Sequence, residues 1–217
     1  MDWWLLSGLT PEQVREVLAR ATRRRFARGE VVFHQGDPAE SLHLIGKGRF
    51  AVRATTPLGD VATIAIRVPG ECFGELALVD GYAHRVATVA ALEETETFAL
   101  AHTEFARLRR DYPQVNEALF AFLANEVRTL NARLLEALFL PVEKRVRRRL
   151  VELSRLYPDE EGKPLVALTQ EAIAELAGAS RATVNQVLRE EAKRGTLELT
   201  RGRTRILDLA SLEQRSR

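Results

Sequence analysis

Short runs of alternating apolar and polar residues, separated by glycines, fill the sequence between Phe26 and Leu100. Runs of three to five residues are too short for helices, and glycine supplies the positive φ angles that tight corners between strands require. The pattern predicts a small antiparallel β-roll, or jelly-roll barrel. The runs begin at Val31, Leu42, Phe50, Ala62 and Val86, and the glycines are Gly29, Gly36, Gly46, Gly48, Gly59, Gly70, Gly74 and Gly81.

A helix is expected ahead of this segment. Thr10 can cap it, Pro11 suits the first helical position, and Gln13 can return a hydrogen bond to the cap. These residues predict a helix over residues 11–20. We assign residues 1–112 to one β-rich domain and the whole chain to the α+β class.

The apolar period changes after Pro113. Six apolar residues follow at steps of 3, 4, 3, 4 and 3, which is the 3.5-residue seam of a two-stranded coiled coil. We expect residues 113–140 to form a long dimerisation helix; the alternative is a helix packed on its own domain. Pro141 interrupts this helix, and residues 139–142 become a candidate hinge before a basic helix over residues 144–156. The seam residues are Phe120, Leu123, Val127, Leu130, Leu134 and Ala137.

Residues 169–194 predict two short amphipathic helices joined by a tight turn that contains Gly178. A glycine in a three-residue turn between two such helices is typical of a helix-turn-helix. Ser180 can cap the second helix, and the following strands flank a basic tip, so residues 141–217 read as a winged helix-turn-helix. An αα-hairpin in a structural bundle is the alternative.

The same region carries the positive charge. Residues 141–217 contain 16 Lys and Arg against 12 Asp and Glu, a balance of +4, whereas residues 1–140 contain 16 against 18. A basic winged helix-turn-helix is expected to bind double-stranded DNA, with Arg181 donating to guanine O6 and N7 in the major groove. The expected DNA-contacting residues are Thr169, Gln170, Ser180, Arg181, Ala182, Thr183, Asn185, Gln186, Arg201 and Arg203.

Composition excludes several other classes. No stretch reaches the ~18 apolar residues of a membrane span, and residues 1–7 carry no basic leader, so we expect a cytoplasmic protein without a membrane partner. The single Cys72 cannot build an iron–sulfur cluster. The four histidines show no metal-ligand spacing, and no Gly-x-Ser-x-Gly motif is present. We therefore expect no metal, no catalytic residue and no enzyme.

Two motifs in this order resemble the CRP/FNR (catabolite activator) family of bacterial transcription regulators. Residues 73–78, Phe-Gly-Glu-Leu-Ala-Leu, followed by Arg85-Val86-Ala87, look like a phosphate-binding cassette of cyclic-nucleotide domains. Residues 169–184 are similar to the family's DNA-reading unit. The resemblance covers nearly the whole chain and implies a cyclic-nucleotide-binding β-roll, a dimerisation helix and a winged helix-turn-helix.

The resemblance also implies roles for the cassette. Glu75 would accept a hydrogen bond from the ribose 2′-hydroxyl, and Arg85 would bind the cyclic phosphate, with cyclic AMP as the expected allosteric effector; a buried Glu–Arg pair without ligand is the alternative. The expected effector-binding residues are Gly74, Glu75, Leu76, Arg85, Val86, Leu130 and Asn131.

Several residues depart from the family pattern. Val86 stands where cyclic-AMP activators have a serine or threonine, and Leu130 and Asn131 replace a Thr-Ser pair. Ala182 replaces a glutamate and Gln186 an arginine in the DNA-reading helix, so base preference should change there. The alternatives are a regulator of the same family that needs no effector, one that binds another ligand, or a haem gas sensor that uses Cys72 and His84.

The implied mechanism is a homodimer on a palindromic operator. Effector binding would move the long helix and set the two recognition helices about 34 Å apart. A contact with RNA polymerase is expected in addition, with the acidic segment Pro158–Gly162 as a weak candidate.

Overall fold

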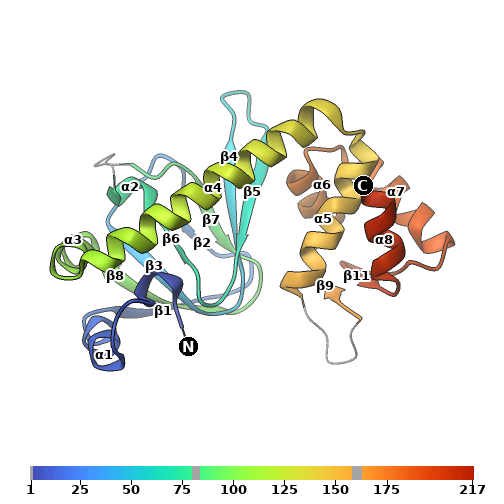
Figure 1. Cartoon of the computed structure of the whole chain (residues 1–217). Helices are drawn as coiled ribbons and strands as arrows, with labels where there is room; N and C mark the ends of the chain where they lie inside the picture. The colour runs from blue at the N-terminus through green and yellow to red at the C-terminus, as the bar shows by residue number, and fades with distance from the viewer. Residues whose placement is uncertain (1, 80–83, 158–162) are drawn as a thin grey trace. The chain divides into compact units, whose positions relative to one another are not determined.

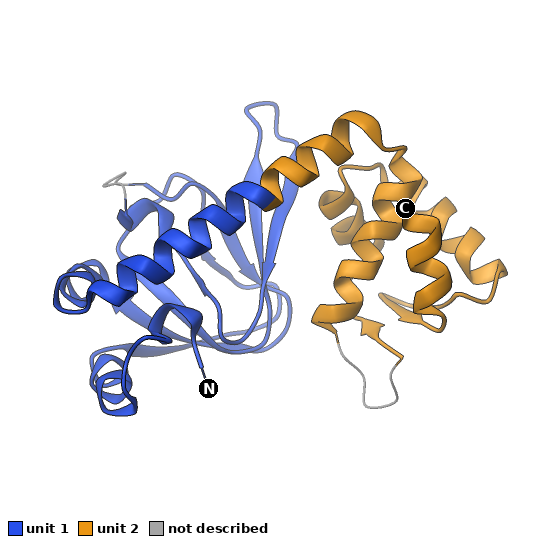
Figure 2. Cartoon of the chain, in the orientation of Figure 1, with its two compact units in different colours: residues 1–128 blue, residues 129–217 orange. Residues whose placement is uncertain are grey.

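The computed structural model describes residues 2–79, 84–157 and 163–217. The chain forms two compact units, residues 1–128 and residues 129–217 (Figure 2). The predictions that concern Gly81 and the segment Pro158–Gly162 fall outside the described residues. No helix in the described part of the chain is long and apolar enough to cross a membrane.

The first unit contains the predicted antiparallel β-roll, built from two four-stranded sheets (Figure 1). One sheet has the order β1-β8-β3-β6 and the other β2-β7-β4-β5. Phe26, Ile45, Phe50, Phe73 and Val89 form an apolar cluster in this unit, with contributions from both sheets. The strands are β1 (Thr22–Phe26), β2 (Val31–Phe33), β3 (Ser41–Lys47), β4 (Phe50–Thr55), β5 (Val61–Arg67), β6 (Cys72–Phe73), β7 (Thr88–Ala91) and β8 (Thr95–Ala101).

Three strands were not among the predicted runs. They are β1, β6 and β8, and the run expected from Val86 begins as a strand only at Thr88. Four of the five residues of β1 are exposed, with three successive arginines, so it shows no apolar alternation. β6 is only two residues long. Pairing with neighbouring strands, rather than local pattern, makes these segments extended.

Helices pack on one face of the sheet β1-β8-β3-β6. They are η1 (Trp4–Leu6), α1 (Pro11–Ala19), α2 (Leu76–Val79), α3 (His102–Asp111) and the first part of α4 (Pro113–Phe139). The predicted start of α1 is confirmed, because the Gln13 N–H donates to Thr10 Oγ1 at 3.3 Å and the Thr10 N–H donates to Gln13 Oε1 at 2.8 Å. Trp3, Leu42, Phe105 and Val115 belong to the second apolar cluster, which joins these helices to the sheet.

Helix α4 leaves most of the predicted seam exposed. It packs on the first unit through Val115 and Leu119, which are buried, whereas Phe120 is 72% exposed, Val127 56% and Leu130 54%. Leu134 and Ala137 are exposed as well, and Leu123 is half-buried. Within the single chain, the stripe is therefore not the face that α4 packs on its own domain.

The second unit has the predicted winged helix-turn-helix. Its elements are α5 (Val142–Leu156), β9 (Leu165–Val166), α6 (Gln170–Ala177), α7 (Arg181–Lys193), β10 (Leu197–Thr200), β11 (Arg203–Ile206) and α8 (Leu209–Ser216). The wing is a three-stranded sheet with the order β10-β11-β9. The expected hairpin is confirmed, while β9 and α8 were not foreseen. Val146, Leu150, Ile173, Val184 and Leu188 are fully buried in this unit.

Helix α4 ends and α5 begins around Leu140 and Pro141, where the proline predicted an interruption of the helix. Polar contacts cross the break. Glu136 of α4 pairs with Arg149 and, at 2.8 Å, with Arg148 of α5, and Arg145 donates to the Ala137 carbonyl at 3.1 Å. The last turns of α4 are thus tied to α5 and belong to the second unit.

Candidate effector cassette and nucleic-acid interface

The cassette lies where β6 turns into the short helix α2. Gly74 has a φ of 88°, in the left-handed region that favours glycine. A Cβ atom on it would lie 2.7 Å from Arg85 Nη1 and 3.0 Å from the Ser41 carbonyl oxygen. The absence of a side chain at Gly74 therefore makes room for the guanidinium of Arg85.

Among the residues that the structure describes, backbone carbonyls hold Arg85 and no carboxylate pairs with it. Its Nη1 donates to the Gly74 carbonyl at 3.2 Å, and its Nη2 donates to the Ser41 carbonyl at 2.8 Å. The guanidinium carbon lies 4.0 Å from the centre of the Phe33 ring, a cation–π contact. Arg85 is only 4% exposed, and within the described residues its buried Nε finds no hydrogen-bond partner.

Glu75 is buried beside it, 5% exposed, yet the two side chains form no ion pair among the described contacts. Burial raises the pKa of Glu75, against the opposing charges of Arg67 and Arg85. Burial also lowers the pKa of Arg85, while Glu40, Asp37 and Glu75 oppose that shift. The cassette thus keeps an acid and a base desolvated and apart, an arrangement that can receive a ligand carrying both a hydroxyl and an anionic group.

The buried side chain of His43 is linked to Arg85 through the hydroxyl of Ser41. Ser41 Oγ lies 3.1 Å from His43 Nε2 and 3.4 Å from Arg85 Nη2, and His43 Nδ1 lies 3.1 Å from Thr97 Oγ1. Burial, followed by the positive charges of Arg85 and Arg24, lowers the pKa of His43 to about 3. Sequence reasoning missed Ser41 and His43, although alternation along one strand places both on the same face.

The other predicted effector residues are exposed. Leu76 is 42% exposed and Val86 45%, next to the two buried cassette residues in sequence. Leu130 and Asn131 are exposed on the part of α4 that belongs to the second unit. Their contact with a base stays a prediction.

The haem alternative finds no support at its two proposed ligands. Cys72 is buried, and burial raises the pKa of its thiol well above the usual value, so the thiolate that binds iron is disfavoured. His84 is exposed. In the part of the chain that the structure describes, no group of three or more histidine, cysteine or acidic residues is placed to hold a metal ion.

The two helices of the DNA-reading unit begin at side-chain caps. Thr169 Oγ1 accepts from the Ala172 N–H at 3.2 Å, and Ser180 Oγ accepts from the Thr183 N–H at 3.1 Å. Gly178 ends α6 with φ 57° and ψ 48°, the left-handed conformation that the tight turn requires. The predicted turn and the cap at Ser180 are confirmed.

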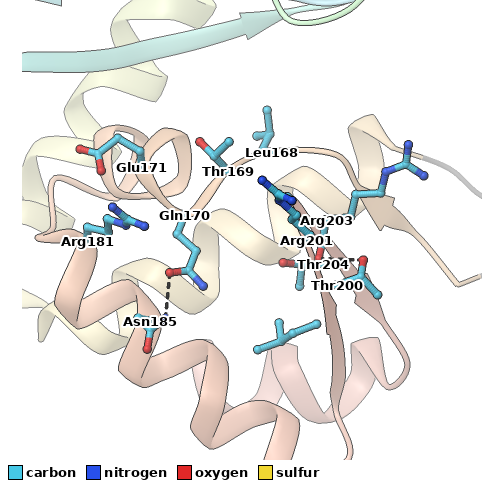
Figure 3. A pocket seen from close by; sticks show the side chains of 12 residues that line it. Leu168, Thr169, Gln170, Glu171, Arg181, Asn185, Thr200, Arg201, Arg203 and Thr204 are labelled. Atoms are coloured by element: carbon cyan, nitrogen blue, oxygen red, sulfur yellow. Dashed lines mark hydrogen bonds between the residues drawn. The ribbon is translucent and has the colours of Figure 1, made fainter.

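A cleft of about 750 Å³ lies between these helices and the wing. Figure 3 shows Arg181 at the start of α7 and Arg201 and Arg203 at the wing tip, all lining this cleft. The cleft brings six predicted DNA-contacting residues together, namely Thr169, Gln170, Arg181, Asn185, Arg201 and Arg203. Ala182 and Gln186 are exposed on α7, whereas Ser180 and Thr183 are engaged in the cap.

One hydrogen bond links the two helices in this cleft. Asn185 Nδ2 donates to Gln170 Oε1 at 2.9 Å (Figure 3). Each amide keeps further hydrogen-bonding capacity, since a side-chain amide has two donors and two acceptor lone pairs. The pair therefore fixes the orientation of two polar groups without exhausting them.

Comparisons with known proteins agree with this arrangement. Residues 23–112 match the cyclic nucleotide-binding domain, and residues 144–215 match the Crp-like helix-turn-helix domain. The chain is 34% identical to the Cyclic AMP receptor protein of Thermus thermophilus over 210 residues, 97% of this chain and 95% of that protein. It is 30% identical to the CRP-like cAMP-activated global transcriptional regulator of Mycobacterium tuberculosis over 216 residues, 98% and 96% of the two chains.

A solved structure extends the likeness. The crystal structure of Thermus thermophilus catabolite activator protein matches with a TM-score of 0.57 at 34% identity, covering 98% of both chains. Both domains occur in the same order in a single chain, and the identity spans nearly all of it. The chain belongs to the CRP-like family of DNA-binding transcription regulators, which are not enzymes.

Proposed function

We propose that this chain is a homodimeric, sequence-specific transcription regulator that cyclic AMP controls by binding at Glu75 and Arg85. The observation that carries the proposal is the incomplete pairing of the cassette. Arg85 Nε is buried without a partner among the described residues, and Glu75 is buried without an ion pair to Arg85. A cyclic nucleotide supplies an anionic phosphate for the arginine and a ribose hydroxyl for the glutamate.

Val86, Leu130 and Asn131 bear on which effector the chain binds. Replacing a hydroxyl side chain by Val86 removes one donor to the phosphate, a loss of about 1 kcal/mol, and leaves the backbone N–H available. Leu130 offers no hydrogen bond to a base, whereas Asn131 does. These residues favour the second candidate, a regulator of this family that another effector controls or that needs none.

The exposed seam of α4 supports the dimer. Phe120, Val127, Leu130 and Leu134 are each more than half exposed and follow one another at coiled-coil spacing. A contiguous apolar stripe of this kind marks an interface in a soluble protein. A twofold dimer predicts a palindromic operator, with Arg181 reading guanine and Ala182 contacting a thymine methyl in each half-site.

The proposed mechanism is a shift between two states of the dimer. Cyclic AMP would favour the state in which the recognition helices are about 34 Å apart. Its effect is limited to its difference in affinity for the two states, so some DNA binding without it is expected. Activation requires in addition a contact with RNA polymerase.

Calorimetric titration of the full chain with cyclic AMP and cyclic GMP tests the effector. The parent should bind cyclic AMP at micromolar concentration, and Arg85→Leu should weaken binding at least about 100-fold, a difference of about 3 kcal/mol. Arg28→Leu, which removes an exposed arginine from the same unit, should bind as the parent does. Absence of binding to the parent would reject cyclic AMP and leave the DNA assignment intact.

Selection of bound duplexes from a random pool tests the DNA assignment. Arg181→Ala should reduce discrimination at one base pair of each half-site by about 1–3 kcal/mol. Lys193→Ala, at the other end of the same helix, should keep the parent's preference. An unchanged preference in Arg181→Ala would contradict α7 as the reading helix.

A further inference from the structure

Arg67 joins the end of β5 to helix α4. Its Nη1 and Nη2 donate to the two carboxylate oxygens of Glu126 at 3.3 and 2.8 Å, a two-bond fork. The Arg67 side chain is only 12% exposed and that of Glu126 30%. Charge-assisted pairs of this geometry fix both position and orientation.

The Arg67 guanidinium also contacts a carboxylate in the turn that leads from β5 into the cassette. Glu71 is 3.9 Å from Arg67 Nη1 and also accepts from the Val68 N–H. Burial alone lowers the pKa of Arg67, but the hydrogen bonds and charge of Glu126, followed by the charges of Glu71 and Glu75, outweigh burial and raise it. Glu75 in turn feels both the attraction of Arg67 and the repulsion of Glu126.

An aromatic pair completes the contact. The Arg67 guanidinium carbon lies 5.1 Å from the centre of the Phe122 ring of α4, and Phe122 stacks on Trp4 at 4.6 Å with the ring planes 12° apart. The backbone N–H of Trp4 donates to the Gly70 carbonyl at 3.2 Å. The turn between Arg67 and the cassette is thus fixed to α4 on one side and to the amino-terminal segment on the other.

We infer that Arg67 is a positioning residue through which occupancy of the cassette is transmitted to α4, because its guanidinium pairs with Glu126 of α4 and with Glu71 in the turn that leads into the cassette. This inference rests on the proposed function. An effector that engages Glu75 and Arg85 shifts the turn that leads into the cassette, and the Arg67–Glu126 fork carries that shift to α4.

A purely structural role makes a different prediction. If the fork only held α4 to the β-roll, its removal would lower stability and leave the link between effector and DNA unchanged. The coupling itself is the ratio of DNA affinities with and without cyclic AMP. By linkage, the same ratio must appear in cyclic AMP affinities measured with and without DNA.

The experiment uses the full chain and a duplex selected by the parent from a random pool. Glu126→Gln and Arg67→Met should bring the coupling ratio at least about tenfold closer to one. Arg67→Lys keeps the charge near Glu75 but loses the fork, so it should retain nucleotide affinity within about fivefold and lose coupling. The control Glu93→Gln breaks the 2.6 Å Arg49–Glu93 pair of the same unit and should keep the parent's ratio.

The outcomes separate the two proposals. A parent that binds no cyclic AMP, or whose DNA affinity ignores it, rejects the proposed function. A coupled parent whose ratio stays within about twofold in Glu126→Gln and Arg67→Lys overturns the role of Arg67. Melting temperatures of all variants identify any that unfold, and the conservative Arg67→Lys decides the question if Arg67→Met does not fold.

Discussion

Each unit of the chain buries a carboxylate among arginines, and the two units treat these charges in opposite ways. Glu191, fully buried in the second unit, accepts from Arg147 at 2.8 Å, Arg215 at 2.7 Å and Thr196 at 3.0 Å. Glu75 and Arg85 are also buried, in the first unit, but form no ion pair with each other among the described contacts. A buried charge that is satisfied within the chain holds elements together, whereas a buried charge that is incompletely paired keeps hydrogen-bonding capacity for another group.

The Glu191 network ties three helices and a strand end into one unit. Arg147 lies on α5, Arg215 on α8 and Glu191 on α7. Thr196 directly precedes β10. Burial alone raises the pKa of Glu191, but the hydrogen bonds from Arg215, Arg147 and Thr196 outweigh burial and lower it to about 2. The folded state therefore stabilises the ionised form of Glu191.

The largest expected effect comes from breaking this network. Glu191→Gln removes the counter-charge of Arg215 and leaves Arg147 with Glu190 alone, which should destabilise the second unit by about 3–5 kcal/mol. Denaturant unfolding of the full chain, followed with separate probes for the two units, measures it. Glu198→Gln on the exposed wing strand should change stability by less than about 0.5 kcal/mol. A loss below about 1 kcal/mol in Glu191→Gln would make the two buried sites energetically alike.

Arg85→Leu should behave in the opposite way. Because the cassette does not neutralise this charge, replacing it by an apolar side chain should leave the unfolding free energy unchanged or raise it by about 1 kcal/mol, while effector binding is lost. The same denaturation experiment measures the stability. Destabilisation by more than about 2 kcal/mol would show that Arg85 holds the β-roll together as Glu191 holds the winged helix.

Acid should affect the first unit before the second. A histidine ordinarily ionises near pH 6.5, so the unfolded chain binds a proton at His43 between pH 6.5 and 3 that the folded chain excludes. Stability from neutral His43 is present above that window and is lost as pH falls, by about 2 kcal/mol at pH 5. Glu191 contributes its loss only between its ordinary pKa of 4.5 and about 2.

Unfolding of the first unit at pH 7.5 and 5 checks this order. His43→Gln should remove about 2 kcal/mol of the pH dependence, and His102→Gln, at an exposed histidine, should retain it. An equally steep dependence in His43→Gln would place the titrating group elsewhere.

The smallest effect concerns polar groups at the surface. Asn185→Ala removes the hydrogen bond to Gln170 in the DNA-reading cleft, where water can replace it. Stability should fall by no more than about 1 kcal/mol, and DNA affinity by a fewfold. Arg15→Ala, which removes an exposed side-chain hydrogen bond to Glu12, is the matched control for stability. A tenfold loss of DNA affinity in Asn185→Ala, but not in the control, would show that the Asn185–Gln170 hydrogen bond matters as much as the buried charged sites.

Features set by neighbouring residues could be predicted from the sequence. The Thr10–Gln13 capping box, the tight turn at Gly178 and the cap at Ser180 depend on residues no more than three apart, and the structure confirms all of them. The β-roll followed from its glycine-punctuated runs. The cassette residues Gly74, Glu75 and Arg85 were found through resemblance to known motifs.

The missing parts depend on contacts between distant residues. Ser41 reaches Arg85 across 44 positions and Arg67 reaches Glu126 across 59, and nothing local marks either pair. β1 is extended because it pairs with β8, although its arginines show no apolar period. Separation along the chain, rather than weak chemistry, hid these contacts.

The position of Arg85 in the cassette depends on the absence of a side chain at Gly74. Its φ of 88° disfavours any other residue, and even one methyl group there would meet the guanidinium of Arg85 at 2.7 Å. Gly74→Ala would displace that arginine while leaving the apolar layers of the β-roll and the wing untouched. Under the proposed function, one codon change at Gly74 would therefore give a regulator that no longer responds to its effector.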